Sequence, residues 1–223
     1  MTLPFPELDT FVQEYNEILK IAQSKAIFVR DIDLQREQIL ILDGLLEKLY
    51  SLKDQSIKEG VEAQSNFLLC LELAVEAVID EFQLIISLKE DKPREAWNYL
   101  VSAQNSLSLS ILNNPVNGDY LLGYAHRFHL YEKLLFPKML FGSAGFTVGK
   151  TECSICKQSY GECDHIKGYA YMGEICSEII HEIISVEEIS LVENPADKRC
   201  LTISFTNNEG KTLDAVTHKE MVT

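Results

Sequence analysis

The stretch Phe67–Leu88, FLLCLELAVEAVIDEFQLIISL, decides the fold of this 223-residue chain. Its apolar residues cover most of the circumference of a helix, which is typical of a helix surrounded by other helices. We therefore predict a central helix from about Val61 to Leu88, with Gly60 marking the break before it. Four carboxylates interrupt the stretch and leave no uncharged run of the ~18 residues needed to cross a bilayer: Glu72, Glu76, Asp80 and Glu81.

The segments around this helix carry the pattern of helices with one buried face. In the first, apolar residues recur at spacings of three and four: Phe11, Val12, Tyr15, Ile18, Leu19 and Ala22. A second helix is predicted to begin at Asp33 and to turn these residues inward: Leu34, Ile39, Leu42, Leu46 and Leu49. Pro93 suits the first position of a fourth helix, and residues 113–118 form a loop before a fifth helix over 119–136. About five helices with short connections predict an antiparallel bundle over residues 1–136.

The composition changes after Pro137, where the helical period is lost and glycines become frequent. Further on, residues 183–186, 189–192 and 200–205 are β-rich, and turns are supplied by Asn194-Pro195 and by residues 207–210. We therefore predict an α+β chain, in which residues 137–223 form a small β domain after the helical bundle.

A group of potential metal ligands lies inside this glycine-rich region. It consists of Cys153, Cys156, Cys163 and His165. A Cys-x-x-Cys turn places two thiolates on one side of a tight loop, and a Cys₃His set binds Zn²⁺ at about 2.0–2.3 Å. Because all four positions would be filled by protein ligands, we predict a structural zinc site. Cys176 is the alternative fourth ligand in place of His165.

Charge and cysteine content limit the partners and the compartment. The formal net charge of −14 disfavours nucleic acid and anionic membrane surfaces, which would be repelled at long range. A protein partner is expected instead. The N-terminus shows no basic patch followed by an apolar run, so we expect a cytoplasmic protein in which clustered cysteines bind metal. The sequence does not determine the oligomeric state.

Two further elements resemble a known family. Residues 188–197, Glu-Ile-Ser-Leu-Val-Glu-Asn-Pro-Ala-Asp, resemble the strand and turn of tailed-phage prohead (capsid maturation) proteases, which typically read Glu-Val-Ser-Leu-Val-x-x-Pro-Ala-Asn. Residues 141–146, Phe-Gly-Ser-Ala-Gly-Phe, resemble the strand that carries the serine nucleophile of that family. The Cys/His insert between them is similar to that of zinc-bearing members, and the resemblance covers about residues 139–205.

The resemblance implies a serine peptidase with Ser143 as nucleophile and His129, His165 or His181 as base. The family places its catalytic histidine on an upstream strand, however, whereas that region is predicted to be helical here. We therefore expect a non-enzymatic, zinc-stabilised interaction subunit of a phage, prophage or bacterial multi-protein system. The peptidase with Ser143 and His129 is the alternative.

Overall fold

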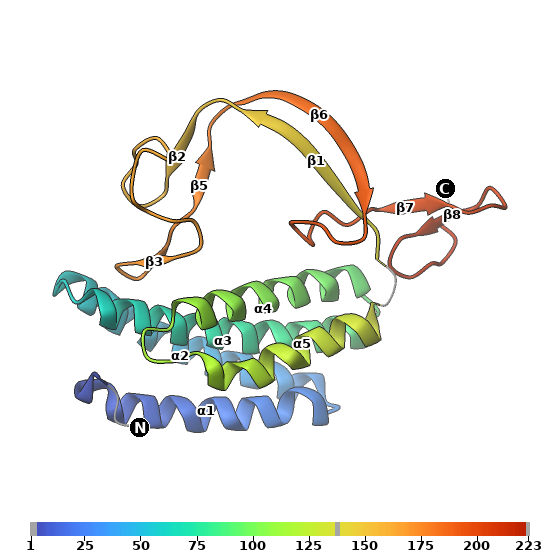
Figure 1. The fold of residues 1–223 in the computed structure, drawn as a ribbon. Helices are drawn as coiled ribbons and strands as arrows, with labels where there is room; N and C mark the ends of the chain where they lie inside the picture. The colour runs from blue at the N-terminus through green and yellow to red at the C-terminus, as the bar shows by residue number, and fades with distance from the viewer. Residues whose placement is uncertain (1–3, 137–138, 222–223) are drawn as a thin grey trace.

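A computed structural model describes residues 4–136 and 139–221. Its first part is a bundle of five α-helices that lie side by side (Figure 1). Helix α3 contacts α1, α2 and α4, and α5 packs against α4. The prediction of an α+β chain that begins with a helical bundle is confirmed. The helices are α1 (Asp9–Phe28), α2 (Ile32–Lys58), α3 (Glu62–Lys89), α4 (Pro93–Asn113) and α5 (Leu122–Leu135), with short 3-10 helices η1 (Pro6–Leu8) and η2 (Asp119–Leu121).

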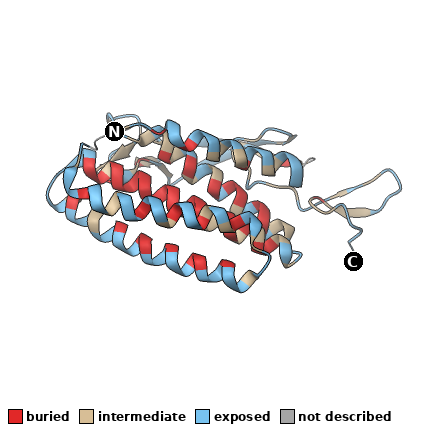
Figure 2. Ribbon diagram, turned by 90° about the horizontal axis from the view of Figure 1, so that it is seen from below, coloured by how far each residue is buried: buried red, intermediate tan, exposed pale blue. Residues whose placement is uncertain are grey.

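Helix α3 is buried along most of its length, as its sequence predicts. One apolar cluster joins it to α1 and α2 and contains Tyr15 and Leu42. A second cluster joins it to α4 and α5 and contains Trp97 and Phe128. Figure 2 shows the buried residues gathered on the facing sides of the helices. Each fully buried large side chain stabilises the bundle by about 1.5–3 kcal/mol, so the two clusters supply most of its packing energy.

The helix boundaries follow local chemistry. Helix α2 begins at Ile32, one residue before the predicted start, because the Asp31 carboxylate caps it and accepts a hydrogen bond from the Asp33 amide at 2.8 Å. The prediction that Leu34 points inward is wrong, since 48% of this residue is exposed. The neighbouring Gln35 takes the buried position and donates its Nε2 to the Ala26 carbonyl at 2.7 Å.

A buried carboxylate ties α5 to α3. The Glu81 side chain is fully buried and accepts hydrogen bonds from the Tyr124 hydroxyl at 2.7 Å, the Arg127 guanidinium at 2.6 Å and the Tyr131 hydroxyl at 2.7 Å. Burial raises the pKa of Glu81, and the Arg127 charge opposes that shift. The charge of Glu81 is therefore compensated by three donors from a single helix.

The second part consists of paired strands. The pair formed by β1 (Phe141–Val148) and β6 (Ile183–Val192) is a long antiparallel ribbon. The predicted runs 183–186 and 189–192 are thus one strand, whereas the run 200–205 is a strand only at its end. The start of the β part at residue 137 lies outside the described residues. The shorter pairs are β2 (Thr151–Cys153) with β5 (Glu178–Ile180), β3 (Ala170–Tyr171) with β4 (Glu174–Ile175), and β7 (Ser204–Thr206) with β8 (Thr212–Asp214).

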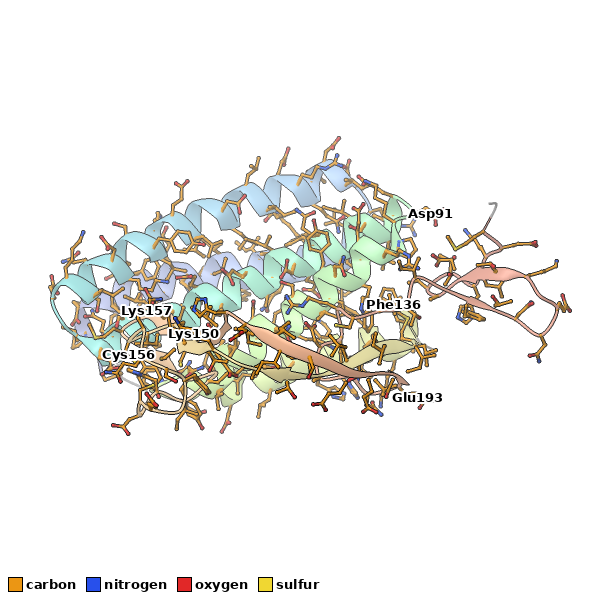
Figure 3. The ribbon with its side chains drawn as sticks, turned by 90° about the horizontal axis from the view of Figure 1, so that it is seen from above. Asp91, Phe136, Lys150, Cys156, Lys157 and Glu193 are labelled. Atoms are coloured by element: carbon orange, nitrogen blue, oxygen red, sulfur yellow. The ribbon has the colours of Figure 1, made fainter. Side chains whose placement is uncertain are left out.

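The ribbon arches over α4 (Figure 1). Aromatic contacts anchor the end of the ribbon at which Phe141 pairs with Val192. The Trp97 ring lies 5.7 Å from the ring of Phe141, and its Nε1 donates to the Lys198 carbonyl at 2.8 Å. Figure 3 shows Phe136 and Glu193 at this end of the ribbon and Cys156 at the other. Across the described ranges, no helix has the length and apolar character that a membrane crossing requires.

Candidate metal centre

The structure brings the four predicted ligands together. The Sγ atoms of Cys153, Cys156 and Cys163 and a ring nitrogen of His165 all lie within 4.8 Å of one another. Ligand atoms of a tetrahedral zinc site stand about 3.3–3.8 Å apart when the bonds are about 2.0–2.3 Å long. These four residues could therefore hold a metal ion, and their donor set is compatible with zinc.

A tight turn after β2 positions the first two thiols. The Cys153 amide donates to the Gln158 carbonyl at 2.8 Å, and the Cys153 carbonyl accepts from the Lys157 amide at 3.0 Å. Burial opposes ionisation of Cys153, but hydrogen bonds from the backbone amides of Cys156 and Ile155 outweigh it and lower the pKa of its thiol to about 6. The turn therefore favours the thiolate, which is the form that binds metal.

His165 carries an atom that a metal would satisfy. Its Nδ1 is buried and has no hydrogen-bond partner among the residues described. The ring is held edge-on against Tyr171, with the two ring centroids 4.6 Å apart. A buried nitrogen without a partner is costly unless it is ligated, so this atom fits the role of a ligand.

Cys176 also lies at the centre. Its sulfur is buried and stands 3.8 Å from the sulfur of Cys153, which equals the edge of a tetrahedral zinc–thiolate site of about 3.8 Å. Burial raises the pKa of its thiol to about 11, and the neighbouring Cys153 adds to that shift. His165 belongs to the group of mutually close ligand atoms, whereas Cys176 adjoins that group through Cys153, and the choice between His165 and Cys176 stays a prediction.

Two asparagines fasten this centre to the helical bundle. Asn66 of α3 donates to the Ala170 carbonyl at 3.2 Å and accepts from the Gly173 amide at 2.8 Å. Asn113, at the end of α4, donates to the Gly168 carbonyl at 2.9 Å and accepts from the Ala170 amide at 2.7 Å. The β3–β4 hairpin, which leads into Cys176, is therefore clamped to two helices. The sequence does not predict this asparagine clamp, because an isolated asparagine carries no pattern that indicates such a contact.

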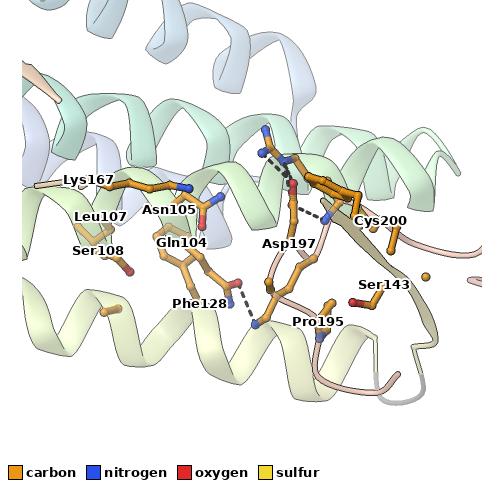
Figure 4. Close-up of a pocket in the computed structure, with 17 residues that line it drawn as sticks. Gln104, Asn105, Leu107, Ser108, Phe128, Ser143, Lys167, Pro195, Asp197 and Cys200 are labelled. Atoms are coloured by element: carbon orange, nitrogen blue, oxygen red, sulfur yellow. Dashed lines mark hydrogen bonds and ion pairs between the residues drawn. The ribbon is translucent and has the colours of Figure 1, made fainter. Parts of the chain in front are cut away.

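Ser143 lies on β1 and lines a cavity of about 950 Å³ between β1 and helices α4 and α5 (Figure 4). His129 is exposed on α5, His165 belongs to the metal group, and His181 pairs with Glu152 at 3.2 Å. Within residues 4–136 and 139–221, no hydrogen bond joins Ser143 to a histidine. The structure therefore does not assemble the serine–histidine pair that the peptidase alternative requires.

Comparisons with protein-family models, with curated proteins and with solved structures give no match to this chain.

Proposed function

We propose that this chain is a non-enzymatic protein-interaction subunit of a phage, prophage or bacterial multi-protein system. A structural zinc ion would fix one end of the β1–β6 ribbon to the helical bundle, and the ribbon would face the partner. The observation that carries this proposal is the metal group itself, whose loop adjoins one end of the β1–β6 ribbon. Asn66 and Asn113 fasten this loop to the helical bundle. The ribbon carries exposed apolar side chains.

The packing of the metal loop supports a structural role for the ion. Between positions 153 and 176 the buried residues are Cys153, Gly173 and Cys176. A segment with so little apolar core cannot offset the conformational entropy of ordering it, and metal binding supplies that folding energy in comparable loops. Because the protein offers at least four ligands, no coordination position is left for a substrate.

The cysteines support a reducing compartment. All six are free thiols, and four of them lie in the metal loop. Disulfides would form between such close sulfurs in an oxidising compartment. We therefore place the proposed function in the cytoplasm.

The test couples metal content to partner capture. A tagged full-length chain and its Cys153→Ser/Cys156→Ser variant would be expressed in the cells that encode the chain, and zinc and co-purifying proteins would be measured. We expect one zinc per parent chain, a partner bound at fixed stoichiometry, and loss of both in the variant. Far-UV circular dichroism would verify that the helices persist. A metal-free folded parent, or a partner retained equally by the variant, would refute the proposal.

The position of Ser143 beside the cavity favours the peptidase as the second candidate. In that case Ser143 would attack a peptide bond, and a histidine would have to move within hydrogen-bond reach of its hydroxyl. Ser143→Ala is the direct test. Full biological activity of this variant would remove the peptidase, whereas loss of a cleaved product with retained folding would favour it.

A further inference from the structure

The β1–β6 ribbon has one apolar face, and two bulges maintain it. Residues opposite each other in an antiparallel pair share a face of the sheet. The pairs on this face are Gly142–Leu191, Ala144–Ile189, Phe146–Val186 and Val148–Ile183. Register shifts leave Glu187 and Ile184 as extra residues in β6, and each extra residue changes which side chains point to which face. Without the first bulge, Glu187 would take the place of Val186 on the apolar face.

The β6 side chains of this apolar face are largely exposed, whereas Gly142, Ala144 and Phe146 of β1 border the cavity between β1 and helices α4 and α5. The exposed fraction is 66% for Leu191, 75% for Ile189, 64% for Val186 and 55% for Ile183. Isolated exposed apolar residues are ordinary on protein surfaces, but a contiguous row on one strand marks an interaction site. The row therefore indicates a surface that is completed by another chain.

The outer edge of β6 is also free to pair. The outer edge of β1 is occupied at its start, where the Gly142 amide donates to the Cys200 carbonyl at 2.8 Å. For β6, within the described parts of the chain, backbone hydrogen bonds join residues 183–192 to β1 alone. An exposed edge of this length presents a row of amides and carbonyls that can bind an extended segment.

The charges along this edge indicate which kind of strand can bind to β6. Neither β1 nor β6 contains Lys or Arg, whereas β6 carries Glu187 and Glu188, and Glu182 and Glu193 flank it. Glu188 pairs with Gly145 on the face opposite to the apolar row. A second copy of this chain would bring the same carboxylates against each other, which is unfavourable. A cationic segment would instead be attracted.

We infer that the outer edge of β6 binds an extended segment of a partner protein in which apolar residues alternate with Lys or Arg. Side chains of an added strand alternate between the two faces, so its apolar residues would extend the row of Ile189 and Leu191. Its cations would lie on the face of Glu188. This inference rests on the proposed interaction function and specifies where and by what chemistry the partner binds.

A synthetic strand tests the inference directly. The probe is a labelled ten-residue peptide that alternates valine with lysine, titrated into the full-length zinc-loaded chain and followed by fluorescence anisotropy. We expect saturable binding that weakens with salt, and slower amide exchange in residues 183–192. Ile189→Thr and the Glu187→Gln/Glu188→Gln pair should each weaken binding about fivefold or more.

Matched variants separate these effects from general changes in surface polarity or charge. Leu40→Gln removes an apolar residue of α2 that is 70% exposed, and Glu37→Gln/Glu47→Gln removes two exposed carboxylates of the same helix. Both should bind the peptide as the parent does. Circular dichroism and zinc content would verify that each variant is folded.

Several results would overturn the inference. The inference fails if the lysine peptide does not bind, or if a peptide with glutamate in place of lysine binds equally well. It also fails if the parent sediments as a dimer that Ile189→Thr dissociates. If the Glu187→Gln/Glu188→Gln variant binds the peptide as the parent does but self-associates, the carboxylates only prevent two β6 edges from pairing. That result would also overturn the inference. A natural partner captured equally by Ile189→Thr would also refute the inference but would leave the proposed function standing. A partner whose capture does not require zinc would refute the proposed function itself.

Discussion

Asp80 of the central helix α3 is expected to make the stability of the protein depend on pH. Burial raises the pKa of its carboxyl from 3.8 to about 6, and the Ser102 hydroxyl opposes the shift. In the unfolded chain the pKa is about 3.9, so the native state holds its proton to higher pH. Linkage then requires that the contribution of Asp80 to the free energy of unfolding falls as pH rises from about 4 to about 6.

The replacement Asp80→Asn removes this titration. The difference between a pKa of about 3.9 in the unfolded chain and about 6 in the native state corresponds to about 3 kcal/mol, so the variant should exceed the parent in stability by up to that amount at pH 7. Near pH 4 the Asp80 carboxyl is protonated in the native state and about half protonated in the unfolded chain, so the difference should fall to about 0.5 kcal/mol or less. For a chain of this size the gain at pH 7 corresponds to about 6–12 °C in melting temperature.

The assay is urea unfolding followed by circular dichroism at 222 nm, for parent and variant, between pH 4 and pH 7.5. The quantity of interest is the difference in unfolding free energy, in which other titrating groups cancel. Asp43→Asn, an exposed change on α2, should stay within about 0.5 kcal/mol of the parent at every pH. A difference for Asp80→Asn that does not vary with pH, or a loss of stability at pH 7, would refute the reasoning.

Three further outcomes are expected. Glu81→Leu should destabilise the chain by about 3–5 kcal/mol in urea unfolding, because the Arg127 charge loses its buried partner, and Glu81→Leu/Arg127→Leu should recover part of that loss. Asn113→Ala should weaken docking of the metal loop by about 1–3 kcal/mol, measured as faster amide exchange at Ala170 with an unchanged bundle. If His165 completes the tetrahedron, His165→Ala should shift the visible bands of the cobalt-substituted protein and Cys176→Ser should not; the reverse pattern would assign Cys176.

Local sequence rules were sufficient for much of the bundle and for the composition of the metal group. Pro93 begins α4 and Gly60 follows α2, as their backbone preferences predict. The apolar circumference of α3 predicts its central place. The spacing of Cys153 and Cys156 in a single loop predicts their approach, because both belong to one tight turn.

Features that depend on distant contacts could not be predicted in this way. The outward position of Leu34 follows from Gln35, which finds a carbonyl at the end of α1. Strand β6 continues through the polar pair Glu187-Glu188 because a bulge accommodates Glu187, whereas the sequence alone shows two separate apolar runs on either side of this pair. The role of Glu81 depends on three donors from α5, and nothing in the run around Glu81 indicates them.

The asparagine clamp has a consequence for the order in which the chain can mature. Asn66 precedes Ala170 by 104 residues, which is about 5–20 s of synthesis. Helices form in about a microsecond, so α3 can be paired with α1 and α2 while the metal loop is still untranslated. The loop cysteines would then be synthesised when α3, which carries Asn66, is already packed against α1 and α2. Assembly of the metal centre would then follow that of the helices to which it is fastened.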